Sequence, residues 1–203
     1  MANTTQVTLI MRLGRGLDPE AWSQFVDVYG PLIYRFGRRR GLQDADAADV
    51  SQDVLREVAR CMDRFQYDPS VGRFRDWLFL VARRRLQNFF RQAGRHTPGS
   101  GDTRVHASLQ ELEGGEEQAD WDQEYRQQLF QWACKQVQAE FEERTWQAFW
   151  QTAVEAKKPA SVGEALGMKV GSVYVAKNRV ISRLRECIAS VESGELEWEK
   201  LDR

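Results

Sequence analysis

The chain has 203 residues, of which 42% are hydrophobic and 11% aromatic, and its formal net charge is −1. These values indicate a folded protein with one core or two small ones, and they exclude a disordered chain. The longest notable apolar run, residues 77–82, is far shorter than a membrane span, and the N-terminus lacks the layout of a signal peptide. Three widely spaced cysteines predict neither a disulfide framework nor a zinc site. We therefore expect a cytoplasmic protein without membrane contact.

The small net charge hides a strong segregation of charge along the chain. Residues 1–95 hold 16 Arg and Lys against 11 Asp and Glu, and residues 156–190 hold 7 against 2. Between these blocks, residues 96–120 hold 1 against 6, and residues 121–155 hold 3 against 6. Two basic blocks separated by acidic stretches are typical of two modules that face a polyanion. A charge asymmetry that only keeps the protein in solution explains the totals equally well.

The first basic block begins with a long predicted helix. In "LDPEAW", Asp18 is the expected N-cap and Pro19 lies in the first turn. Gly41 is the expected end of this helix, and Gly30-Pro31 is a candidate kink.

Two more helices complete the first block. The second spans residues 44–65, and "YDPSVG" at 67–72 separates it from a third helix in "GRFRDWLFLVARRRLQNFFRQ". The expected apolar arc of the third helix consists of Phe74, Trp77, Leu78, Val81 and Phe89. Phe79, Leu86 and Phe90 widen this arc beyond what one neighbouring helix would cover. A core helix with a basic edge explains only part of this stretch. Rings beside guanidinium groups also suit unpaired nucleic acid, because bases stack on the rings while arginines hold the phosphates.

The second predicted helix carries an acidic stripe. Asp46, Asp49, Asp53 and Glu57 fall on one narrow arc. Like charges at i,i+4 cost about 0.2–0.5 kcal/mol per pair. A solvated face is the usual reading of such a run, and a docking strip for a basic partner is the alternative. The stripe by itself favours the solvated face.

Residues 92–120 predict a flexible acidic linker, since this stretch is rich in glycine and carries an acidic excess. A second helical module follows at 121–190, and residues 191–203 form an acidic tail. The module contains predicted helices near 121–138 and 140–155, which "KKP" brings to an end.

A helix-turn-helix layout closes the second module. A capping box, Ser161 to Glu164, opens a short helix at 162–166. "GMKVG" is the turn, and a basic helix runs from Ser172 to about Ser190. A short helix, a glycine-containing turn and a longer basic helix are typical of DNA binding. An amphipathic helical hairpin without DNA contact is the alternative.

On the last helix, one side is expected to pack inward through Val173, Ala176, Val180, Leu184 and Cys187. The outward set is Tyr174, Val175, Asn178, Arg179, Ser182 and Arg185. It offers an amide suited to adenine, an arginine suited to guanine, and hydroxyl and cationic groups for phosphates.

Two long stretches carry a family resemblance. The segment "DPEAWSQFVDVYGPLIYRFGRRRGLQDADAADVSQDVLREVARCMDRFQYDPSVGRFRDWLFLVARRRLQNFFR" resembles the second conserved region of bacterial extracytoplasmic-function (ECF) sigma factors of the sigma-70 superfamily. The segment "RTWQAFWQTAVEAKKPASVGEALGMKVGSVYVAKNRVISRLREC" is similar to their fourth region. The resemblance implies an all-α protein: a region 2 three-helix bundle within residues 1–91 and a region 4 helix-turn-helix within 121–190, joined by the linker.

The resemblance also implies partners and site residues. Such a factor binds core RNA polymerase through its β′ and β subunits, recognises promoter DNA and helps to open it; an anti-sigma factor is a further candidate partner. The expected contacts to the β′ coiled coil are Asp46, Asp49, Gln52 and Asp53. The expected contacts to the melted −10 element are Gln66, Tyr67, Trp77, Arg84, Arg85 and Asn88. The expected contacts to the −35 major groove are Ser172, Tyr174, Val175, Asn178 and Arg179. The linker would thread the channel later used by nascent RNA.

Two other functions compete with this one. A stand-alone regulator with an N-terminal effector or dimerisation domain would also carry a C-terminal helix-turn-helix, and would bind duplex DNA tightly by itself. An enzyme is the remote alternative. His96 and His106 both fall in the predicted linker, and no nucleophile–base pair, metal-ligand spacing or phosphate loop is present. We therefore expect no catalytic residues, no metal and no cofactor.

Overall fold

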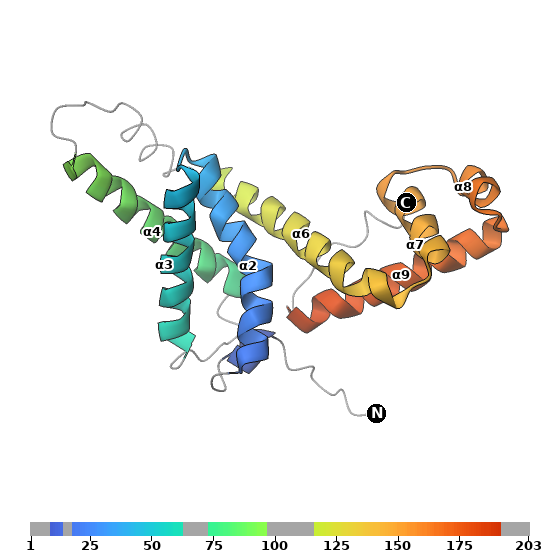
Figure 1. Ribbon diagram of the computed structural model, residues 1–203, viewed down its shortest axis with the longest axis horizontal. Helices are drawn as coiled ribbons and strands as arrows, with labels where there is room; N and C mark the ends of the chain where they lie inside the picture. Colours follow the sequence, from blue (N-terminus) through green and yellow to red (C-terminus); the bar gives the residue numbers. More distant parts are fainter. Residues whose placement is uncertain (1–8, 14–17, 63–72, 97–115, 192–203) are drawn as a thin grey trace. The chain divides into compact units, whose positions relative to one another are not determined.

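A computed structural model describes residues 9–13, 18–62, 73–96 and 116–191. Every regular element within these ranges is helical, which confirms the all-α prediction (Figure 1). The helices belong to two compact units, Leu9–Gln128 and a second one that contains the chain from Leu129 onward. Within the described ranges, no helix combines the length and the apolar character that crossing a bilayer requires.

The first unit is built on α2 (Pro19–Arg39), which a short helix α1 (Leu9–Leu13) precedes. As predicted, Asp18 is the N-cap of α2, and its carboxylate accepts hydrogen bonds from the backbone N–H groups of Glu20 and Ala21, both at 3.1 Å. The Ala21 N–H and the guanidinium of Arg12, 2.8 Å away, lower the pKa of Asp18. This carboxylate therefore stabilises the fold at neutral pH, and the contribution is lost as the pH falls through its lowered pKa.

The helix α2 ends at Arg39, close to the predicted stop, and Gly41 has a left-handed φ of +86°. The helix continues through Pro31. A proline has no backbone N–H, so the carbonyl four residues earlier loses its helical partner. The side-chain amide of Gln128 donates to this carbonyl, that of Asp27, at 3.3 Å. A residue about a hundred positions further along the chain thus supplies the bond that Pro31 cannot.

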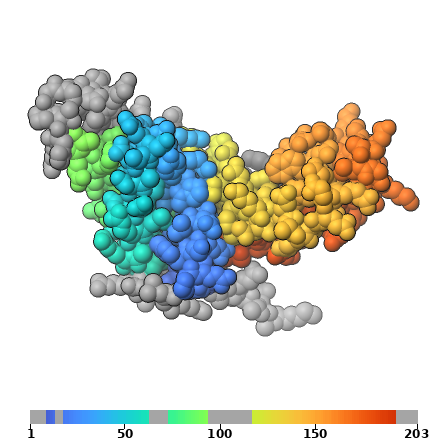
Figure 2. All heavy atoms as spheres, in the orientation of Figure 1, coloured from blue at the N-terminus to red at the C-terminus, as the bar shows by residue number. Residues whose placement is uncertain are grey.

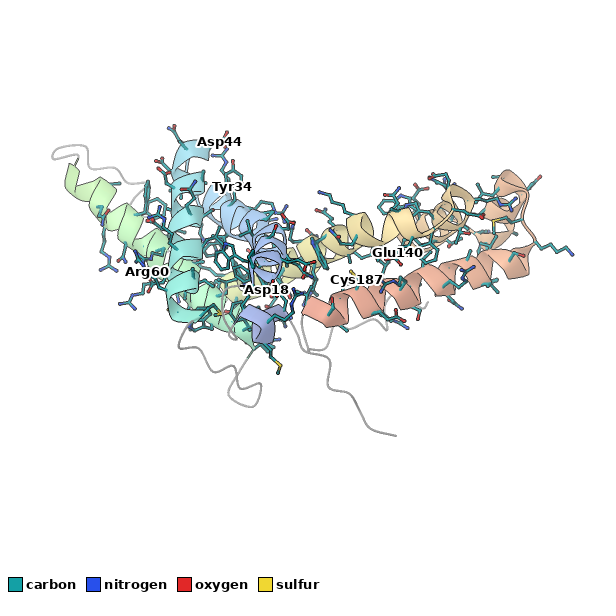
Figure 3. The ribbon with its side chains drawn as sticks, turned by 60° about the horizontal axis from the view of Figure 1, so that its bottom comes forward. Asp18, Tyr34, Asp44, Arg60, Glu140 and Cys187 are labelled. Carbon is teal, nitrogen blue, oxygen red and sulfur yellow. The ribbon has the colours of Figure 1, made fainter. Side chains whose placement is uncertain are left out.

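Helices α3 (Asp44–Met62) and α4 (Phe74–His96) complete the three-helix arrangement. At the α2–α3 junction, the hydroxyl of Tyr34 donates to Asp44 at 3.0 Å, and the two residues lie close together in Figure 3. The side chains of α2 and α3 form much of the viewed face of the first unit in Figure 2. The predicted inward residues of α3 are buried: Val54, Val58 and Met62. Phe65, the expected end of this helix, lies outside the described residues.

The widened apolar arc predicted for α4 is present, but its buried side is shifted toward Phe79, Leu86 and Phe90. Its buried series is Phe74, Leu78, Phe79, Ala82, Leu86 and Phe90. The predicted members Trp77, Val81 and Phe89 are only half-buried. The arc is rotated because a further helix, α6 (Glu116–Val137), covers the side of α4 that carries Phe79.

The first half of α6 is part of the first unit. Trp121 is 1% exposed and Tyr125 is fully buried. The Trp121 ring lies 5.1 Å from the ring of Phe36 and 5.6 Å from that of Phe79, measured between centroids. Tyr125 stacks on Tyr29 at 5.7 Å. These contacts place residues 116–128 in the core of the first unit.

Ion pairs surround this aromatic contact. Three carboxylates of α6 each pair with an arginine of α2, of its C-cap or of α4. The distances from arginine Nε to carboxylate oxygen are 2.5 Å for Arg39 and Glu124, 3.1 Å for Arg40 and Glu117, and 3.2 Å for Arg75 and Asp122. Burial raises the pKa of Glu124, and the guanidinium of Arg39 opposes this shift. Part of the acidic excess of this segment is therefore used in packing.

The predicted linker is wrong at both ends. Residues 92–96 finish α4, with His96 as its last residue, and residues 116–120 begin α6. Residues 97–115, which include His106, lie outside the described residues, as does the predicted tail from 192 onward. The helix was predicted to start at 121 because residues 92–120 have the composition of a linker. Composition does not show that Trp121 and Tyr125 are buried against α2 and α4.

The second unit contains α7 (Glu143–Phe149), a π-helical turn (Trp150–Val154), α8 (Pro159–Leu166) and α9 (Val170–Val191). The predicted capping box is wrong. The helix α8 begins at Pro159 with Lys158 as N-cap and has no side-chain cap bond, so Ser161 lies inside it. Pro159 was expected to stop the preceding helix; it begins the next one, because its fixed φ suits the first helical position.

Candidate nucleic-acid and polymerase interface

Among the described helices, α3 and α6 leave one arc of α4 uncovered. On one side, Arg85 Nη2 lies 2.6 Å from Glu57 Oε2 of α3. On the opposite side, Arg83 Nε lies 3.4 Å from Glu117 Oε2 of α6. Between these two contacts, Leu80 is 58% exposed.

The uncovered arc holds three of the predicted −10 contacts. With about 100° per residue, Trp77, Arg84 and Asn88 fall within a narrow sector of α4. Arg84 is exposed, and Trp77 and Asn88 are half-buried. The arrangement offers a ring, a cation and an amide on one accessible surface. We call this surface, with Leu80, the α4 arc.

Arg85 lies at the border of the α4 arc. Its ion pair with Glu57 is partly shielded, with the two side chains 33% and 35% exposed. The charge of Arg85 is therefore largely compensated within the protein, and we expect Arg84 to contribute more to phosphate binding. The other two predicted −10 contacts, Gln66 and Tyr67, lie outside the described residues.

The residues of the acidic stripe on α3 have two different roles. Glu57 serves the contact between α3 and α4 through Arg85. Asp53 pairs with Arg56 on its own helix at 2.9 Å. Asp49 and Gln52 are exposed, and Asp46 is half-buried; no ion pair joins Asp46 or Asp49 to a described side chain. The predicted polymerase contacts thus form a surface whose negative charge is only partly compensated.

The helix-turn-helix of the second unit is held together by a small apolar core. Ala148 of α7, Val162 of α8, and Val173 and Ala176 of α9 pack together. Gly167 ends α8 with a left-handed φ of +61°, as the predicted turn requires. The carboxylate of Glu140 accepts two bonds from the guanidinium of Arg183, from Nε at 2.6 Å and from Nη2 at 2.9 Å. This interaction joins α9 to the turn before α7, and it lowers the pKa of Glu140. Figure 3 labels Glu140.

Gly163 allows the close approach that forms the turn. A Cβ added at Gly163 would lie 2.7 Å from the carbonyl oxygen of Met168. We expect Gly163→Ala to destabilise the second unit by about 1–3 kcal/mol, because the rigid backbone must shift. Gly171→Ala is the matched control, since a Cβ there meets nothing within 4 Å. Urea unfolding followed by circular dichroism measures both variants; equal stability of the two would contradict the expectation.

The orientation of α9 agrees with the sequence in most positions. Val173, Ala176, Val180 and Leu184 are buried, whereas Cys187 is half-buried. All five predicted −35 contacts are exposed: Ser172, Tyr174, Val175, Asn178 and Arg179. The guanidinium carbon of Arg179 lies 6.0 Å from the ring centroid of Phe141. The structure brings these five side chains to one face at the start of α9.

Two features of the site were missed from the sequence. Leu80 is exposed because neither α3 nor α6 packs against that side of α4. The assignment of Glu57 to an internal ion pair depends on its contact with Arg85. Neither feature has a local sequence signal, because both arise from contacts between separate helices.

Residues 25–96, which contain most of α2 and all of α3 and α4, match the family model described as sigma-70 region 2. No curated protein matches the chain. Among solved structures, it is similar to that of CnrH in complex with the cytosolic domain of CnrY. That comparison has a TM-score of 0.37 and 18% sequence identity, over 91% of this chain and 97% of the other.

Proposed function

Since residues 25–96 match the family model of sigma-70 region 2, we propose that the whole chain is an RNA polymerase sigma factor of the ECF type. In this role it binds core polymerase, recognises the −10 and −35 promoter elements and directs the start of transcription. The observation that carries the proposal is the α4 arc, which lies within the matched segment. There a ring, a guanidinium group and an amide share a surface that α3 and α6 leave accessible.

The α4 arc suits an unpaired strand at the −10 element. Bases that leave the duplex can stack on the ring of Trp77, which contributes about 1–3 kcal/mol per base. Arg84 supplies a charge for the strand's phosphates, and the amide of Asn88 can donate and accept bonds at a base edge. The α4 arc thus combines a stacking surface, a cation and a partner for a base edge on one helix.

Core polymerase is proposed to bind the α3 surface. Asp46, Asp49, Gln52 and Asp53 form its acidic side, and the partner is a basic face of the β′ coiled coil. Charge complementarity of this kind increases the association rate and fixes the register of the two surfaces. Binding to a basic partner would then offset the repulsion between the like charges on α3.

The second unit is proposed to bind duplex DNA at the −35 element. Its helix α9 carries Lys169, Lys177 and Arg179 at or beside its first turns, and cations there can hold phosphates while the exposed side chains reach base edges. The same layout occurs in stand-alone regulators, which is the alternative function.

One experiment separates the two functions. A sigma factor co-purifies with core polymerase and is required for run-off transcription from its promoter, whereas the free chain binds duplex weakly. A stand-alone regulator binds duplex tightly without core polymerase, usually as a dimer on a palindrome. Tight binding by the free chain together with no effect of core polymerase would overturn the proposal.

Removing the Arg179 side chain tests the duplex contact of α9. We expect Arg179→Ala to weaken upstream-element binding by the polymerase complex by about 1–3 kcal/mol, if the guanidinium makes a two-bond contact to a base. Lys135→Ala, an exposed cation on α6, is the control and is expected to bind normally. Filter binding at fixed salt measures both. Unchanged occupancy for Arg179→Ala would assign this residue to the fold.

A further inference from the structure

The start of α9 exposes an unusual amount of apolar surface. Val170 is 42% exposed, Tyr174 is 52% exposed and Val175 is 60% exposed. Among the described residues, the other large exposed hydrophobic side chains are Leu80 and Val154. Removing apolar surface from water stabilises a complex by about 25 cal/mol per Å². This surface therefore gains free energy when a partner with apolar groups covers it.

Val175 lies on the outward face of α9, next to Arg179. With about 100° per residue, Gly171, Val175, Asn178 and Ser182 fall within a sector of about 60°, and Arg179 borders it. A Cβ added at Gly171 would meet nothing within 4 Å. The helix backbone is thus open beside Val175, so a partner surface can come close to this side chain.

The charge around this face selects the partner. No Asp or Glu occurs between Glu164 and Glu186. In the same stretch, Lys169 and Arg179 are exposed and Lys177 is half-buried. A cationic border around a small apolar centre is complementary to a polyanion that presents apolar groups between its phosphates. Duplex DNA meets this description, because each thymine places a C5-methyl group in the major groove.

We propose that Val175 reads a thymine of the upstream promoter element by contact with its C5-methyl group. Asn178 and Arg179 lie one turn further along the same face, where an amide suits adenine and a guanidinium suits guanine. This inference rests on the proposed function and goes beyond it, because it assigns one base to one side chain.

Uracil provides a direct test, since it pairs like thymine and lacks only the methyl group. Full-length chain with core polymerase selects upstream elements from duplexes randomised at those positions, and each selected thymine is then replaced by uracil. For the unsubstituted protein, we expect one replacement to lower affinity about fourfold, the effect of about one buried methylene-sized group. For Val175→Ala, we expect the thymine and uracil duplexes to bind equally.

Val154→Ala is the control, because Val154 is 40% exposed and lies outside α9. It should keep the preference for thymine. Equal thymine preference in Val175→Ala and the unsubstituted protein would overturn the inference, as would a selected element in which no thymine is sensitive to uracil. Both results leave the proposed function intact, because the chain with core polymerase has still selected an upstream element.

If Val175→Ala instead weakens binding to core polymerase, the apolar surface is a protein contact and the inference fails. Absence of any selected element would contradict the proposed function itself.

Discussion

The double variant Asp49→Arg, Asp53→Arg is expected to lose association with core RNA polymerase by about 100-fold or more. Replacing carboxylates by cations opposite a basic partner places like charges together, which costs several kcal/mol, and each 1.4 kcal/mol corresponds to tenfold in affinity. Both residues lie on α3, and Asp49 is exposed. Surface plasmon resonance with immobilised core polymerase measures the loss.

The fold should survive these two substitutions. Asp53 makes an exposed ion pair with Arg56, and such pairs contribute only about 0–1 kcal/mol. The double variant Asp27→Arg, Asp120→Arg is the matched control, because it makes the same change in charge at exposed positions of the first unit away from α3. If both double variants lose association equally, the effect is one of total charge. Retained association in the α3 variant would assign the stripe to a solvated face.

Trp121→Ala is expected to destabilise the first unit by about 3–5 kcal/mol, the usual cost of deleting a buried tryptophan ring. The side chain is 1% exposed and contacts the rings of Phe36 on α2 and Phe79 on α4. Its loss leaves a cavity between three helices. Hydrogen exchange of the α2 and α4 amides, followed by mass spectrometry, measures the free energy of opening.

Two further variants define the cause of this loss. Trp121→Phe keeps a ring and removes the indole N–H, which is buried without a hydrogen-bond partner; we expect a cost below about 1.5 kcal/mol. Gln127→Ala changes an exposed position on the same helix and should stay within about 0.5 kcal/mol. If Trp121→Ala changed the exchange of α2 and α4 no more than Gln127→Ala, residues 116–128 would not stabilise the first unit.

The predicted −35 contacts illustrate where local patterns suffice. On α9, the burial of Val173, Ala176, Val180 and Leu184 follows from the helical period, and so does the exposure of the five residues opposite. The turn at Gly167 follows from the conformational freedom of glycine. In contrast, α8 begins at Pro159 instead of after the expected capping box, because two local start signals competed within three residues.

The sequence alone determined the all-α class, the N-cap at Asp18, the inward faces of α3 and α9 and the residue types on the outward faces, because helical periodicity and end signals are local. Only the tertiary structure decided the extent of the first unit, where Trp121 and Tyr125 of α6 complete the core and Gln128 bonds the carbonyl that Pro31 leaves without a helical partner. It also decided which part of α4 stays accessible. The physical reason is that burial and ion pairing between helices distant in sequence depend on their packing, which no local pattern encodes.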